Sequence, residues 1–126
     1  MRISTLLLRV SVLLLLIGLC VGIGMAMTQD FRLRGTHAHI NLVSFVIMFI
    51  TGLYYRVVPA AETLGLARAH AYLHILAAII LPIGIAALTL IGPAYEVIAI
   101  VGSLIFLTAM ILFAIVVHRT SGPLNG

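Results

Sequence analysis

Four long stretches without a charged residue divide the chain, and short breaks that carry the charges separate them. The stretches cover residues 10–27, 36–55, 69–95 and 97–118. A helix needs about 20 apolar residues to cross a hydrocarbon core about 30 Å thick. The pattern therefore predicts four transmembrane helices in a single domain over residues 1–126, at approximately 5–27, 35–58, 67–91 and 94–118.

Composition excludes a water-soluble protein. Hydrophobic residues make up 63% of the chain and charged residues 8%, a balance that a small soluble domain cannot cover with polar surface. The expected fold class is an all-α integral membrane protein. A signal peptide is the alternative for the N-terminal stretch, but its apolar segment spans only about 7 to 15 residues, so the longer stretch here predicts a retained helix.

The basic residues indicate topology and not binding to nucleic acid. The net charge of +4 comes from seven arginines and three carboxylates. Four crossings place five arginines on one side of the membrane: Arg2, Arg9, Arg56, Arg68 and Arg119. Only Arg32 and Arg34 lie on the other side. The positive-inside rule then predicts a multi-pass protein of the cell's inner (cytoplasmic) membrane with both termini in the cytoplasm.

The histidines are the candidates for chemistry, because ionisable groups within a membrane span are costly and usually mark a site. His37 and His39 open the second predicted helix, and residues two apart on a helix point about 200° away from each other. They cannot bind one metal ion together, but they can offer one imidazole to each of two pockets. A planar haem takes one such nitrogen from each face. The alternative is that both merely mark the helix end and bond to headgroups or to Asn41.

A second pair, His70 and His74, is spaced i,i+4 and lies on one face of the third helix, which suits a single metal ion. We expect this pair near the cytoplasmic side, in a polar cluster at the membrane interface with Tyr54, Arg68 and His118, and the alternative is a separate metal or proton-handling site on that side. At the outer side, Arg32 and Arg34 are candidates to pair with haem propionates, or else with lipid phosphates.

The stretch from Thr36 to His74 resembles helices X and XI of haem-copper oxidase subunit I. The resemblance rests on His37-Ala38-His39, then Gly52-Leu53-Tyr54-Tyr55 and Pro59, and then on the run Arg68-Ala69-His70-Ala71-Tyr72-Leu73-His74. It implies that the first histidine of the motif ligates a high-spin haem and the second a low-spin haem. The His-Pro-Glu-Val-Tyr element and the His-His pair of that family are missing here, so the resemblance implies no copper site.

The family's subunit has twelve helices in three arcs of four, so three copies of this chain restore twelve. The resemblance thus favours a homotrimer in which His39 of one copy and His37 of the next hold one haem b. A dimer or a larger partner subunit is the alternative.

The expected function is haem binding or electron transfer in the membrane, with a redox partner or a quinol as a further partner, and without turnover chemistry of its own. Two alternatives stay open. One is a catalytic oxidase-like or gas-binding haem subunit. The other is a small transporter or structural protein without haem.

Overall fold

The structure is a computed structural model and describes residues 1–122, which contain no strand. The described chain forms four helical segments that are long and apolar enough to cross a membrane. The first is α1 (Ile3–Thr28). The second span comprises α2 (Arg34–His39), the π-helix η1 (Ile40–Ile47) and α3 (Met48–Val57). The third is α5 (Gly65–Leu90), and the fourth joins the 3-10 turn η2 (Pro93–Tyr95) to α6 (Glu96–Thr120).

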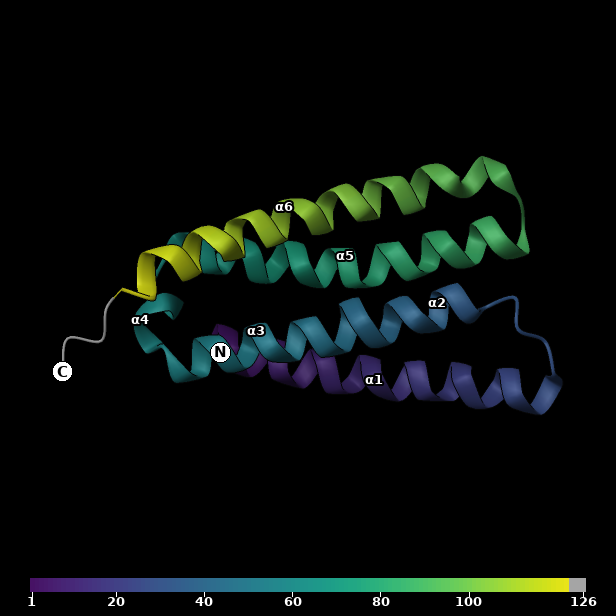
Figure 1. The fold of residues 1–126 in the computed structure, drawn as a ribbon, viewed down its shortest axis with the longest axis horizontal. Helices are drawn as coiled ribbons and strands as arrows, with labels where there is room; N and C mark the ends of the chain where they lie inside the picture. The colour runs from purple at the N-terminus through teal and green to yellow at the C-terminus, as the bar shows by residue number, and fades with distance from the viewer. Residues whose placement is uncertain (123–126) are drawn as a thin grey trace.

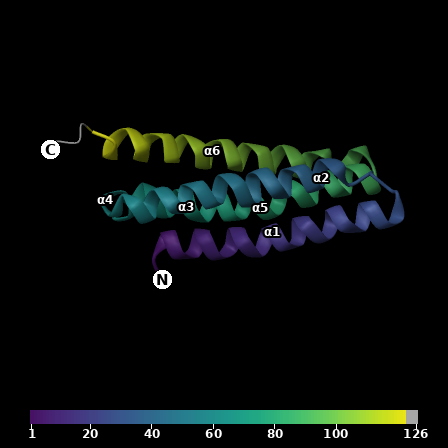
Figure 2. The ribbon, with the colours of Figure 1, turned by 60° about the horizontal axis from the view of Figure 1, so that its bottom comes forward.

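The four segments run alternately up and down in one bundle. The second span and α5 lie in the middle, while α1 and α6 lie on opposite outer sides (Figures 1 and 2). Both ends of the described chain lie at one end of the bundle, together with the short helix α4 (Pro59–Glu62). We call this the terminal end, and the opposite end, where α1 connects to α2, the distal end.

The outward surface is as apolar as the interior. Large hydrophobic side chains are exposed on each of the four segments, for example Leu13, Ile50, Ile83 and Leu104. A surface of this kind is stable against hydrocarbon and not against water. The prediction of an all-helical protein is therefore confirmed for the described residues, and four of its helical segments are long and apolar enough to cross a membrane.

Glycines bring α5 and α6 close together. A Cβ atom built at Gly84 would meet the main-chain nitrogen of Ala99 and would lie 2.8 Å from its Cα atom. At Gly102 the same atom would lie 2.8 Å from the Cα atom of Leu81. Lipid tails are as apolar as leucine, so close van der Waals contact between backbones has to hold such helices together.

A proline in α5 leaves one main-chain carbonyl without its helical donor, and a side chain of the neighbouring span donates a hydrogen bond to it. Pro82 has no N–H, so the carbonyl of Ala78 loses its usual helical donor. The hydroxyl of Ser44 donates to that carbonyl at 2.8 Å. Ser44 belongs to the π-helix of the second span, a rare form that occurs often at functional sites. The two middle segments are thus joined by polar contacts as well as by packing.

At the terminal end, Glu62 of α4 connects to the start of α1. Its carboxylate accepts hydrogen bonds from the main-chain N–H of Ser4 at 2.7 Å and from the Ser4 hydroxyl at 2.9 Å. It also pairs with the Arg2 guanidinium at 2.7 Å. Burial raises the pKa of the Glu62 carboxyl, but the hydrogen bonds from Ser4 and Arg2 outweigh this effect, and the pKa lies below its ordinary value.

Replacing Glu62 with glutamine is expected to lower the free energy of unfolding at neutral pH by about 1 to 2 kcal/mol, since hydrogen bonds to a charged group are lost. The folded pKa is depressed, so the unfolded chain binds the proton more readily. The contribution of Glu62 is therefore complete above the ordinary glutamate pKa and is lost as the pH falls through the lower folded value. Thermal unfolding in detergent at neutral and acidic pH measures it.

Glu96→Gln is the matched control, because the Glu96 side chain is exposed and its carboxylate has no hydrogen bond or ion pair within residues 1–122. Equal losses for the two variants, or a Glu62 effect that persists at acidic pH, would contradict the assignment.

Candidate functional site: two helix-end histidines and a buried histidine pair

His37 lies where the second span faces α1, and Gly22 of α1 leaves room for its ring. Its Nδ1 atom is 2.8 Å from the carbonyl oxygen of Gly18. Its ring covers Gly22, where a Cβ atom would lie 2.7 Å from Cε1 of the imidazole. A carbonyl can only accept, so Nδ1 carries the proton and Nε2 holds the lone pair. That lone pair accepts from the side-chain amide of Asn41 at 3.2 Å.

His39 has the same tautomer on another side of the helix. Its Nδ1 donates to the carbonyl of Gly35 at 2.8 Å, which leaves the lone pair on Nε2. No hydrogen bond to this Nε2 atom is formed by residues 1–122, and the ring is half-buried. A neutral imidazole whose other nitrogen donates to a carbonyl is the form that ligates metals. Each histidine therefore holds a lone pair on Nε2, which in His37 is engaged by Asn41, and the structure does not bring the two imidazoles together.

Two expected partners of a haem propionate, Arg32 and Arg34, differ in their contacts. Arg32 binds both carboxylate oxygens of Asp30, with an ion pair of 2.7 Å. The hydrogen bonds from Arg32 lower the pKa of Asp30, and the same pair raises the pKa of Arg32. Arg34 is exposed and forms no hydrogen bond or ion pair with a side chain of the described residues. Of the two, Arg34 is the one whose guanidinium is available to a ligand.

His70 and His74 form a hydrogen-bonded chain with a tyrosine in the bundle interior. The Tyr55 oxygen lies 2.9 Å from Nδ1 of His70, and Nε2 of His70 lies 3.3 Å from Nδ1 of His74. The chain continues from Nε2 of His74 to the carbonyl oxygen of Val43, at 3.0 Å. Phe113 packs on the His70 ring and Phe106 on the His74 ring.

The carbonyl of Val43 determines where each proton lies in this series of hydrogen bonds. It can only accept, so His74 carries its proton on Nε2 and its lone pair on Nδ1. His70 must then donate from Nε2, which leaves its Nδ1 as the acceptor for the Tyr55 hydroxyl. Each ring nitrogen of the two histidines thus has a hydrogen-bond partner, and all three hydrogen bonds donate in the same direction, from Tyr55 towards Val43.

The expectation of a polar cluster at the membrane interface is corrected for these two histidines. Both are 0% exposed, and so is Tyr55. The His74 ring reaches Val43, which is four residues, or about 6 Å along the helix, from His39. The third segment packs against the π-helix and so brings His74 towards the middle of the bundle. As a metal site the pair has no third ligand, since residues 1–122 contain no group of three or more metal-ligating His, Cys, Asp or Glu side chains.

Removing the Tyr55 hydroxyl is expected to destabilise the protein. Tyr55→Phe leaves the buried Nδ1 atom of His70 without a donor, which costs about 1 to 3 kcal/mol. The control is Tyr54→Phe, since the Tyr54 hydroxyl bonds to Thr120 at a half-buried position near the terminal end. Thermal unfolding of the two variants in the same detergent compares them. Similar stability of both would show that the Tyr55 hydroxyl is not the donor to a buried acceptor.

In the sequence, Tyr55 belongs to the motif Gly52-Leu53-Tyr54-Tyr55, and no pattern connects it to His70. The only signal was the apolar setting of a Tyr-Tyr pair, which does not say which tyrosine faces the interior. The fold and these two groups of residues define an all-helical protein with four helices able to cross a membrane and with ionisable groups inside. No family model, curated protein or solved structure matches the chain.

Proposed function

We propose that the chain is a membrane haem b protein in which His37 and His39 supply axial ligands, and that it binds haem or carries electrons. One observation carries the proposal. Both imidazoles donate Nδ1–H to a main-chain carbonyl and hold the Nε2 lone pair, on different sides of one helix. The motif resemblance to haem-copper oxidase subunit I supports the same two residues.

The surroundings of His37 fit a bound group. The Oδ1 atom of Asn41 is buried and has no hydrogen-bond partner within the described residues, which is a costly state for a polar atom. Its amide nitrogen donates to Nε2 of His37, so iron at this nitrogen would displace that hydrogen bond and free the Asn41 side chain to turn its Oδ1 atom towards a donor. Arg34 lies near the same end and would pair with a propionate.

A second copy of the chain would complete the iron site. His37 and His39 diverge, and His70 and His74 are engaged with each other in the interior. His118 is exposed near the terminal end. The economical second ligand is the histidine of a neighbouring copy, and a trimer restores the twelve helices that the resemblance implies. Bis-histidine haem exchanges single electrons and leaves no open iron position, so the proposed role is not catalytic.

The arginine distribution supports an inner-membrane location with both termini in the cytoplasm. The terminal end would then face the cytoplasm, and the histidine motif at the distal end would face outward. A redox partner or a quinol would supply and remove the electrons.

A reduced-minus-oxidised absorption spectrum of the purified protein, with the haem-to-protein ratio, tests the proposal. A Soret band and a bis-histidine spectrum that carbon monoxide does not change are expected. A shift on adding carbon monoxide would favour a gas-binding or oxidase-like subunit instead. Absence of haem after expression with an added haem precursor would reject both.

The second candidate is a small transporter without haem that moves protons, and the Tyr55–His70–His74 chain favours it. Such a chain of donors and acceptors inside a membrane span is a common feature of proton pathways. It ends, however, on the carbonyl of Val43, which accepts a hydrogen bond and passes on no proton. Because the series of hydrogen bonds stops at this carbonyl, the haem protein is the first candidate function and the proton transporter the second.

A further inference from the structure

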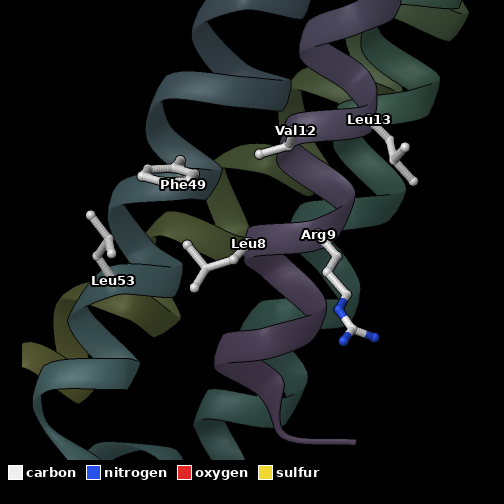
Figure 3. A pocket seen from close by; sticks show the side chains of 6 residues that line it. All are labelled: Leu8, Arg9, Val12, Leu13, Phe49 and Leu53. Atoms are coloured by element: carbon white, nitrogen blue, oxygen red, sulfur yellow. The ribbon is translucent and has the colours of Figure 1, made fainter.

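An apolar groove runs along the outer surface between α1 and α3. It has a volume of about 520 Å³ and is lined by Leu8, Arg9, Val12, Leu13, Phe49 and Leu53. Figure 3 shows Leu8 and Val12 on α1 opposite Phe49 and Leu53 on the second span. Gly52 keeps the two helices close behind it, since a Cβ atom there would lie 3.2 Å from the Leu8 side chain. The groove therefore has an apolar floor built from two helices.

Two arginines lie where this groove approaches the terminal end. The Arg9 side chain points from α1 towards the start of that helix (Figure 3). Arg56 reaches across from α3 and donates to the hydroxyl of Thr5 at 2.8 Å. Thr5 is one turn before Arg9 on the same face of α1, so the hydrogen bond places the Arg56 guanidinium about one helical turn from the point where Arg9 leaves that helix. Both arginines are exposed, and neither forms an ion pair within residues 1–122.

The chain has no side-chain carboxylate to spare for these two cations. It contains three: Asp30, Glu62 and Glu96. Asp30 pairs with Arg32 beyond the distal end of α1, and Glu62 is engaged by Arg2 and Ser4. Glu96 begins α6, which also places it at the distal end. A second copy lying on the groove would therefore bring further positive charge to this depth, and the neutralising anion has to come from elsewhere.

We propose that the groove binds an anionic phospholipid, with the phosphate on Arg9 and Arg56 and an acyl chain along Leu8, Val12, Phe49 and Leu53. Arginine binds phosphate oxygens through paired N–H donors. The hydrocarbon chain fits the floor because the four side chains that form it are apolar. The terminal end would then lie in the leaflet that holds the anionic lipid, in agreement with the arginine count. The site is independent of the histidines and of haem.

Native mass spectrometry of the delipidated full chain in mild detergent tests the site. The protein is titrated with phosphatidylglycerol and, separately, with phosphatidylcholine of the same acyl chains. We expect tighter binding of phosphatidylglycerol, and a loss of about five-fold in its affinity for each arginine removed in Arg9→Gln, Arg56→Gln and the double variant. Val12→Trp, which fills the groove floor, should weaken both lipids.

The matched control is the double variant Arg68→Gln and Arg119→Gln, which removes the same charge from exposed positions near the terminal end and outside the groove. Its lipid preference should equal that of the wild type. Equal binding of the two lipids by the wild type, or an equal loss in the control variant, would overturn the site. An unchanged lipid preference together with an altered oligomeric state in the Arg9 and Arg56 variants would assign the groove to a second copy and would also overturn it.

Discussion

Replacing His39 with alanine is expected to remove most of the haem from the purified protein. His39 offers an Nε2 lone pair with no competing hydrogen bond from the described residues, on a ring that its Nδ1 bond to Gly35 holds in place. Without it, one axial position loses its ligand, and a ligand loss in a haem site changes or abolishes the low-spin spectrum. The measurement is the Soret absorbance per mole of protein.

His118→Ala is the matched control for this change. His118 also donates Nδ1–H to the carbonyl four residues earlier, that of Ala114, at 2.8 Å, so its local bonding is the same as that of His39. It lies in the last turn of α6, at the other end of the bundle. The haem content of the His118→Ala variant should equal that of the wild type. An unchanged spectrum in His39→Ala would reject the ligand assignment.

A co-expression experiment separates a shared site from a site within one chain. A His37→Ala chain and a His39→Ala chain should each be poor in haem alone. Mixed oligomers should recover some sites, because His39 of the first chain can then pair with His37 of the second. One haem per chain in a monomeric wild type, without recovery on mixing, would refute the shared site and indicate a non-histidine ligand within one subunit.

Replacing Gly84 with alanine is expected to destabilise the contact between α5 and α6. The added methyl group would meet the backbone of Ala99, which cannot move aside as a flexible side chain can. Overpacking of this kind costs about 1 to 3 kcal/mol, and here it would push α5 away from α6 along their contact. Loss of helical circular dichroism on heating in detergent, compared with the wild type, measures the effect.

Gly24→Ala is the matched control. Gly24 is also within a long apolar helix, but a Cβ atom there meets nothing within 4 Å. Alanine has a higher helix propensity than glycine by about 1 kcal/mol, so this variant should be as stable as the wild type or slightly more stable. If Gly84→Ala were equally well tolerated, the close contact between α5 and α6 would not be a main source of stability.

Several features of this protein followed from the sequence alone. The lengths of the uncharged stretches determined four helices long enough to cross a membrane, because the thickness of the hydrocarbon core leaves little freedom in helix length. The spacing of His37 and His39 determined that they diverge, because the helical repeat allows no other arrangement for residues two apart. Gly18 and Gly22 have the GxxxG spacing that allows close contact between helices, and the structure places the His37 ring against Gly22 and the Asn41 side chain against Gly18.

Only the tertiary structure decided which residues meet. Tyr55 joins His70, and His74 joins the carbonyl of Val43, across pairs that lie 15 and 31 residues apart. The sequence also did not determine which arginine pairs with Asp30, since Arg32 and Arg34 both lie close to it along the chain. In the structure the partner is Arg32. In a soluble protein the apolar face of a helix tells which side turns inward. Here the outer face meets hydrocarbon and is as apolar as the inner face, so the sequence pattern carries little information on the rotation of each helix about its axis.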